Sequence, residues 1–160
     1  MKSQLTEDSR WKYLRSETFN YDFDKTNGFT AMWGRNQKED PEFSPFGGII
    51  GDIEITDICQ GVTQLDGKQK VCSWCYKANT PCGGNMSFET FKTIIDKMPH
   101  TIAPEPFIRK DKRIFVLTQI ALGLDSHGTS NPDTWRMMEY CRSVGIIPNL
   151  TIAEIYEVVA

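Results

Sequence analysis

Residues 52–86 read DIEITDICQGVTQLDGKQKVCSWCYKANTPCGGNM, a strand-like run followed by four of the five cysteines of the chain. Residues 49–58 are predicted to form a β-strand, because apolar and polar side chains alternate over residues 53–56 with a two-residue period. Cys72 and Cys75 form a Cys-x-x-Cys pair, in which two thiolates bind one soft metal centre without stretching the backbone. The stretch therefore predicts a strand that leads into a metal-binding cysteine loop.

The long gap between Cys59 and Cys72 contains a hairpin signal. Asp66-Gly67 is a strong two-residue turn, and short runs that suit strands flank it. A hairpin centred there has the pairs Leu65–Lys68, Val62–Val71 and Gly61–Cys72. Because paired residues of antiparallel strands have Cα atoms roughly 5 Å apart, we expect Cys59 to return beside Cys72 and Cys75.

Three kinds of cysteine site compete for this loop. A disulfide framework is disfavoured because the cysteine count is odd and a chain of 160 residues does not need covalent cross-links. Structural zinc bound by Cys59, Cys72, Cys75 and Cys82 stays open, although zinc ribbons usually carry two Cys-x-x-Cys pairs. An iron–sulfur site with three thiolates and one open iron agrees best with the single pair.

A strand that ends in a cysteine, the segment CSWCY at 72–76 and the run NMSFETF at 85–91 resemble the start of a radical S-adenosylmethionine (SAM) domain. The likeness is to uncharacterised radical SAM proteins of phage and bacterial genomes. It implies that Cys59, Cys72 and Cys75 hold a four-iron four-sulfur (4Fe-4S) cluster whose unliganded iron binds SAM. It also implies an enzyme that, with an electron donor, cleaves SAM to a 5′-deoxyadenosyl radical and acts on a small-molecule or macromolecular substrate.

The resemblance also assigns cofactor contacts. Radical SAM domains usually carry Gly-Gly-Glu after their second strand, and the matching residues 121–126 read ALGLDS, so Gly123 and Asp125 take these places. Tyr76 follows the last cysteine, at a position that often contacts adenine in the family. The chain departs from the family in the twelve residues, 60–71, between its first two cysteines. Cys82 matches no family ligand, and no residue is assigned as catalytic.

The rest of the chain predicts alternating helices and strands. Ser87 caps an amphipathic helix that Pro99 ends, and the apolar run 113–123 predicts a strand buried on both faces. Asn131 caps a second helix that Gly145 ends, and residues 146–152 form a third strand. The residues expected on the buried side of the second helix are Trp135, Met138 and Cys141.

Such alternation predicts βαβ units with parallel strands. The expected fold class is α/β, with residues 49–160 forming the N-terminal half of a radical SAM (β/α) barrel. The chain supplies only part of the strands of a full barrel, which predicts a truncated domain or one that assembles with a second polypeptide. An inactive remnant of a radical SAM gene is a further hypothesis.

Residues 1–48 are predicted to form an N-terminal extension with a hairpin and a linker. Aromatic residues alternate over 19–23 before Asn27-Gly28, and Phe29, Ala31 and Trp33 alternate after it, which predicts a β-hairpin with one aromatic face. The extension either covers the substrate as a lid or packs against the outside of the barrel. Residues 37–48, rich in proline and glycine, form the linker.

Composition narrows the possible partners. The formal net charge of −3 gives no electrostatic case for a nucleic-acid partner. No apolar run approaches the ~20 residues that cross a bilayer, and residues 1–8 lack the apolar core of a secretion signal. We therefore expect a cytoplasmic protein without a membrane partner, in a reducing compartment that keeps thiols available for metal.

Overall fold

The computed structural model describes residues 3–59, 61–70, 73, 82–104, 109–123 and 130–150. Contacts between residues divide the chain into two compact units. Unit 1 contains residues 1–51, 97–119 and 141–147, and unit 2 contains residues 52–96, 120–140 and 148–160. Each unit is therefore assembled from segments that lie far apart in the sequence.

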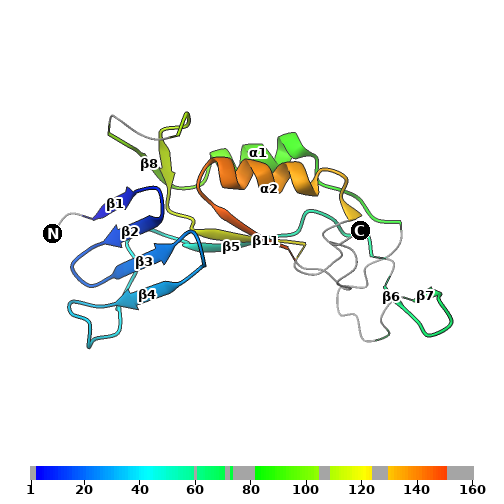
Figure 1. Cartoon of the computed structure of the whole chain (residues 1–160), viewed down its shortest axis with the longest axis horizontal. Coiled ribbons are helices and arrows are strands. Elements are labelled where there is room, and N and C mark those ends of the chain that lie inside the picture. Colours follow the sequence, from blue (N-terminus) through cyan, green and yellow to red (C-terminus); the bar gives the residue numbers. More distant parts are fainter. Residues whose placement is uncertain are drawn as a thin grey trace. The chain divides into compact units, whose positions relative to one another are not determined.

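Unit 1 contains a four-stranded antiparallel meander (Figure 1). Its strands are β1 (Gln4–Glu7), β2 (Trp11–Arg15), β3 (Asn20–Asp24) and β4 (Thr30–Trp33). Burial alternates along β2, where Lys12 and Leu14 are buried between half-buried neighbours, as in a sheet with one covered face. The core on that face consists of Leu14, Phe19, Tyr21, Phe23 and Val116.

The predicted hairpin is present as β3 and β4, but the prediction that its aromatic residues share one face is wrong. The observed register pairs Tyr21 with Met32 and Phe23 with Thr30, so odd-numbered residues of β3 share a face with even-numbered residues of β4. Tyr21 and Phe23 are consequently buried, while Trp33 lies on the other face, under the guanidinium of Arg15 at 5.1 Å. The five-residue connection between the strands sets this register, and a shift of one residue exchanges the faces.

Removing the Tyr21 hydroxyl is expected to lower the free energy of unfolding by about 1 kcal/mol. This buried hydroxyl lies 3.3 Å from Thr118 Oγ1, which in turn donates to the Ile49 carbonyl at 2.7 Å. Urea unfolding of Tyr21→Phe measures the loss, with the half-buried Tyr13→Phe as the control. Equal stability of Tyr21→Phe and the wild type would show that this buried bond contributes nothing.

A three-stranded sheet has the order β11 (Ile147–Leu150), β10 (Gln119–Leu122), β5 (Ile50–Ile53). The predicted first strand is therefore present in shorter form, and the predicted third strand is present as β11, with residues 151 and 152 outside the described part of the chain. The Thr118 N–H donates to the Ile49 carbonyl, and the Gly123 N–H donates to the Ile53 carbonyl. Both partners advance together along the chain, so β5 and β10 run parallel.

The expected radical SAM (β/α) barrel is nevertheless wrong. Antiparallel pairing predominates, because β6 (Val62–Thr63) pairs with β7 (Gln69–Lys70) and β8 (His100–Ile102) pairs with β9 (Arg113–Phe115), beside the four-stranded meander. The described residues contain two helices, and the strands of the described residues do not close into a barrel. The barrel prediction failed because it missed β1, β2 and the β8–β9 pair, whose antiparallel strands outnumber the parallel ones.

The predicted continuous strand 113–123 is broken between β9 and β10. Residues of β9 pair with β8 in an antiparallel ladder. At the break, the Leu117 carbonyl accepts a hydrogen bond of 2.8 Å from the Lys12 ammonium of β2, and the Val116 N–H donates to the Pro99 carbonyl. These backbone groups therefore bond outside the β5–β10 ladder, which is why the apolar run does not form one strand.

Both predicted helices are confirmed, as α1 (Phe88–Asp96) and α2 (Thr134–Ser143). Ser87 caps α1, since its hydroxyl accepts the Thr90 N–H at 3.2 Å. The Phe88 ring of α1 meets the Tyr140 ring of α2 edge-on, with 5.9 Å between centroids. The buried side of α2 differs from the prediction, because Trp135 is half exposed while Met137 is fully buried. None of the helices within the described ranges is long and apolar enough to cross a membrane.

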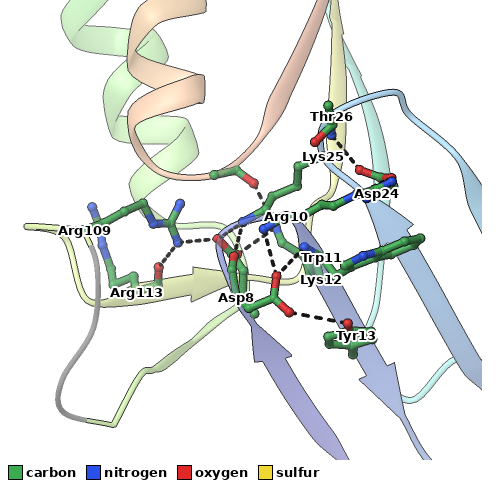
Figure 2. A network of polar contacts seen from close by, with 12 residues as sticks. Asp8, Arg10, Trp11, Lys12, Tyr13, Asp24, Lys25, Thr26, Arg109 and Arg113 are labelled. Atoms are coloured by element: carbon green, nitrogen blue, oxygen red, sulfur yellow. Dashed lines mark hydrogen bonds and ion pairs between the residues drawn. The ribbon is translucent and has the colours of Figure 1, made fainter.

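Unit 1 contains a network of charged side chains that includes Lys12, Lys25 and Arg109 (Figure 2). All three cations form ion pairs with the buried Glu7. The Glu7 carboxylate is almost inaccessible and lies 2.8 Å from Lys25 Nζ, 3.1 Å from Arg109 Nη2 and 3.8 Å from Lys12 Nζ. The Lys12 ammonium is fully buried and also donates to the Gly145 carbonyl at 3.1 Å. Burial lowers the pKa of Lys12 to about 7, although nearby Glu7 opposes this shift. The folded chain therefore buries a lysine amine that loses its charge near neutral pH.

Candidate functional site

The cysteine-rich segment of unit 2 is closed at its base by two short antiparallel segments, residues 55–57 and 84–86, which we call the loop neck. Thr56 and Asn85 form a β-bridge. The Asp57 N–H donates to the Gly84 carbonyl at 3.2 Å, and the Met86 N–H donates to the Ile55 carbonyl at 2.9 Å. The Asp57 carboxylate accepts a further bond from the Gly84 N–H. The loop neck thus joins the two ends of the segment that carries the four clustered cysteines.

Close approach at the loop neck depends on Gly83. A Cβ at this position would lie 2.8 Å from the backbone carbonyl carbon of Asp57 and still closer to the Asp57 carboxylate. Any side chain there would push residues 57 and 83 apart. Gly83 is therefore required by packing at the loop neck.

Asn131 secures the loop neck from the start of α2. Its side-chain Nδ2 donates to the Ile55 carbonyl at 2.7 Å and to the Met86 carbonyl at 2.8 Å. Its Oδ1 accepts the Asp133 N–H at 2.9 Å, so every polar atom of the buried amide has a partner. The sequence predicted Asn131 as a helix cap, but local spacing carried no signal of its contacts with residues 55 and 86.

Cys59 is the one predicted cluster ligand that lies among the described residues. It follows the loop neck by two residues, is partly buried, and its Sγ accepts the Gly61 N–H at 3.3 Å. Gly61 has a φ of 82°, the left-handed conformation that suits glycine. An amide that donates to sulfur stabilises a thiolate, and hydrogen bonds of this kind are among the features that tune metal–sulfur centres. The surroundings of Cys59 therefore suit a metal ligand.

The hairpin that follows Cys59 is present, with a register that differs from the prediction. Val62 pairs with Lys70 and Thr63 pairs with Gln69, one residue away from the expected pairs. Gly67 has a φ of 77° and its N–H donates to the Gln64 carbonyl, so the connection has three residues, 65–67, instead of two. The chain turns back between Cys59 and Cys72 as predicted, while Cys72 and Cys75 lie outside the described residues.

The remaining predicted site residues divide between described and undescribed positions. Gly123 ends β10 with a φ of 68°, and its N–H is engaged by the Ile53 carbonyl of β5 at 3.2 Å. Tyr76 and Asp125 lie outside the described residues. Gly123 thus lies beside the end of the strand that leads to Cys59, and its amide already has a partner.

The two other described cysteines have contrasting surroundings. Cys82 is exposed and precedes the loop neck by two residues, the mirror position of Cys59 relative to the Asp57–Gly84 pair. Cys141 is fully buried, and burial raises the pKa of its thiol to about 12. Cys141 therefore stays protonated, in the buried position that the sequence predicted.

A hollow of about 340 Å³ adjoins the loop neck. Its lining consists of Glu54, Ile55, Thr56, Asp57, Gly84, Asn85 and Met86. Glu54 and Thr56 belong to the end of the segment 49–58 that the sequence predicted to be a strand. The structure places both at this hollow, together with the Asp57 carboxylate, which gives the lining an acidic character close to Cys59 in the chain.

No family model, curated protein or solved structure matches this chain. Within the described ranges, no cluster of three or more histidine, cysteine, aspartate or glutamate side chains could hold a metal ion. Cys72 and Cys75 lie outside these ranges. The local chemistry of Cys59, the loop neck and the hairpin therefore carries the functional argument.

Proposed function

We propose that this chain is a radical SAM enzyme, or a part of one, in which Cys59, Cys72 and Cys75 hold a 4Fe-4S cluster. One observation supports the proposal most: the loop neck and the β6–β7 hairpin turn the chain back on both sides of Cys59. A cysteine separated from a Cys-x-x-Cys pair by twelve residues becomes a plausible third ligand only if those residues fold back. The same fold leaves the motif at 72–76 to follow directly after β7.

The residues of this chain would hold the cluster and adjust its charge. The Gly61 N–H lies 3.3 Å from Cys59 Sγ and would reduce the negative charge of a bound thiolate. The loop neck would fix the backbone on which Cys59 is carried. A bound 4Fe-4S cluster supplies electron transfer to the SAM sulfonium, while the protein supplies ligation, orientation and exclusion of water.

The hollow beside the loop neck is proposed to take part of the bound nucleotide or substrate. Its Glu54 and Asp57 side chains give it negative charge, which favours a positively charged ligand group such as the amine or sulfonium of SAM. Tyr76, Gly123 and Asp125 remain proposed cofactor contacts. The reaction requires an electron donor as partner, and a reducing cytoplasmic compartment would keep the thiols available.

A zinc-binding module is a second candidate, because Cys82 and Cys59 occupy mirror positions at the loop neck. Each lies two residues beyond the Asp57–Gly84 pair on its own segment. Four thiolates from Cys59, Cys72, Cys75 and Cys82 would complete a tetrahedral zinc site with no open position. Such a site would stabilise the loop without supporting catalysis.

Product analysis tests the enzymatic proposal. The chain is reconstituted anaerobically with iron and sulfide, reduced with dithionite in the presence of SAM, and assayed by mass spectrometry for 5′-deoxyadenosine and methionine. We expect both products from the wild-type chain and neither from Cys75→Ala treated in the same way. A reconstituted chain that carries iron and sulfide but forms no more 5′-deoxyadenosine than Cys75→Ala would refute the proposal that the chain is a radical SAM enzyme.

A further inference from the structure

We propose that Asn131 is a positioning residue for the metal site, because its buried amide clamps the loop neck and so controls how firmly the cysteine loop retains metal. This inference rests on the proposed metal site. Asn131 lies more than forty residues beyond the last clustered cysteine in the sequence. Its link to the loop is made only by the folded structure.

The clamp acts on both segments of the loop neck at once. Nδ2 of Asn131 donates to Ile55, which precedes Cys59 by four residues, and to Met86, which follows Cys82 by four residues. One amide group therefore holds the entry and the exit of the cysteine loop against each other. The Ile55 carbonyl also accepts the Met86 N–H at 2.9 Å, so the clamp and the loop neck share an acceptor.

The orientation of the clamp is fixed by the start of α2. The Asn131 carbonyl accepts the Thr134 N–H at 3.1 Å and the Thr134 hydroxyl at 2.8 Å, while Oδ1 accepts the Asp133 N–H. If the side-chain amide were rotated, its NH₂ would face the Asp133 N–H and its oxygen would face two carbonyls. Only the observed orientation satisfies all of these groups.

Helix α1 is tied to the same point. The Asp133 carboxylate accepts the N–H of Phe88, the first residue of α1, at 3.3 Å. The loop neck, the start of α1 and the start of α2 thus form one connected network of buried or half-buried polar groups. Opening the loop neck would leave the Asn131 donors without acceptors in a buried site, which is costly.

Metal ligands on a loop keep their geometry only if the loop ends stay fixed, and residues that orient ligands typically change metal affinity by 10–100-fold when mutated. We therefore expect loss of the clamp to increase the rate of metal release. Loss of the clamp should therefore weaken retention of the metal although the cysteine ligands themselves are intact.

Asn131→Ser separates the clamp from the helix cap. Serine caps helices about as well as asparagine, but its hydroxyl replaces the amide that reaches two carbonyls. Gly83→Ala tests the loop neck from the other side, because its Cβ would collide with Asp57. Ile95→Val serves as the control, since it removes a methyl group from a fully buried position of α1 away from the loop neck.

Two measurements decide the inference. In the metal-free chain, hydrogen exchange of the Asp57 and Met86 amides should accelerate about tenfold in Asn131→Ser and in Gly83→Ala, and remain unchanged in Ile95→Val. In the chain loaded with iron and sulfide, release of iron to a chelator should accelerate about tenfold in the same two variants. Similar release rates in Asn131→Ser and the wild type would overturn the inference, as would equal acceleration by Ile95→Val.

The two proposals fail in different ways. A wild-type chain that takes up no iron refutes the metal site and the retention role of Asn131, even if the exchange experiment shows that the clamp exists. A chain that takes up iron normally but exchanges its Asp57 and Met86 amides at the same rate in Asn131→Ser keeps the metal site and loses the clamp.

Discussion

Alanine at Cys59, Cys72 or Cys75 is expected to lower the iron and sulfide content of the reconstituted chain by roughly tenfold or more, because a cluster with two remaining thiolates is not retained. Iron and acid-labile sulfide are measured after anaerobic reconstitution and removal of unbound metal. The brown absorbance of the wild type should disappear in all three variants. Unchanged iron content in Cys59→Ala would show that Cys59 is not a ligand of the cluster.

Cys82→Ser is the matched control for these variants. Cys82 lies in the same loop and is exposed, so its replacement should leave the fold and the iron content unchanged if three thiolates hold the cluster. If Cys82→Ser instead loses metal as completely as Cys72→Ala, four thiolates bind the metal. That result would favour the structural zinc module over the enzyme.

Stability of unit 1 is expected to rise with pH between about 7 and 10, because of Lys12. Its pKa is lowered to about 7 by burial, against 10.5 for an ordinary lysine. Between these values the unfolded chain binds a proton that the folded chain does not bind, so the free energy of unfolding increases with pH. The loss of stability that comes from burying Lys12 is fully present below pH 7 and disappears as the pH rises toward 10.5. From pH 7.5 to 9.5 we expect an increase of about 2 kcal/mol from this group.

The groups that face Lys12 are Glu7, Lys25 and Arg109, of which the two cations lower its pKa further and Glu7 raises it. Lys12→Met removes the titrating amine, so urea unfolding at a series of pH values should give a flatter dependence than the wild type. Lys68→Met, at an exposed position of the β6–β7 hairpin, should leave the slope as it is. Parallel wild-type and Lys12→Met curves would show that Lys12 does not titrate in this range.

Local signals in the sequence predicted the helices well. Ser87 before an apolar stripe and Asn131-Pro132 before α2 placed both helix starts close to their observed positions. The Asp66-Gly67 turn located the β6–β7 hairpin, and the apolar residues of the segment 49–58 indicated a strand that is present as β5. These features depend on residues close in sequence, where capping and turn chemistry act directly.

Features set by distant contacts were not predicted. The break in 113–123 depends on Lys12, more than a hundred residues away, which donates to Leu117.

Two local turns were also missed or misplaced. The β1–β2 hairpin of the meander was missed, although Asp8 carried a signal, because its carboxylate accepts the Arg10 and Trp11 N–H groups in a local turn. The register of β6–β7 shifted because Gly67 lengthened the turn by one residue.

The candidate site shows the same division. The sequence singled out the cysteines because their spacing alone suggests metal chemistry. The loop neck could not be predicted, because Asp57 meets Gly84 and Asn131 meets Ile55 only after unit 2 has folded. Alternating strands and helices also suggested a barrel, since a strand–helix–strand pattern does not reveal how many antiparallel strands accompany it.

Electron paramagnetic resonance of the reconstituted, dithionite-reduced chain, recorded with and without SAM, shows whether three thiolates hold a cluster with one open iron. We expect about four iron and four sulfide per chain and a reduced-cluster signal whose g-values shift when SAM is added, because one iron is open to the nucleotide. A colourless chain that binds only zinc, or an iron signal that SAM leaves unchanged, would contradict this expectation.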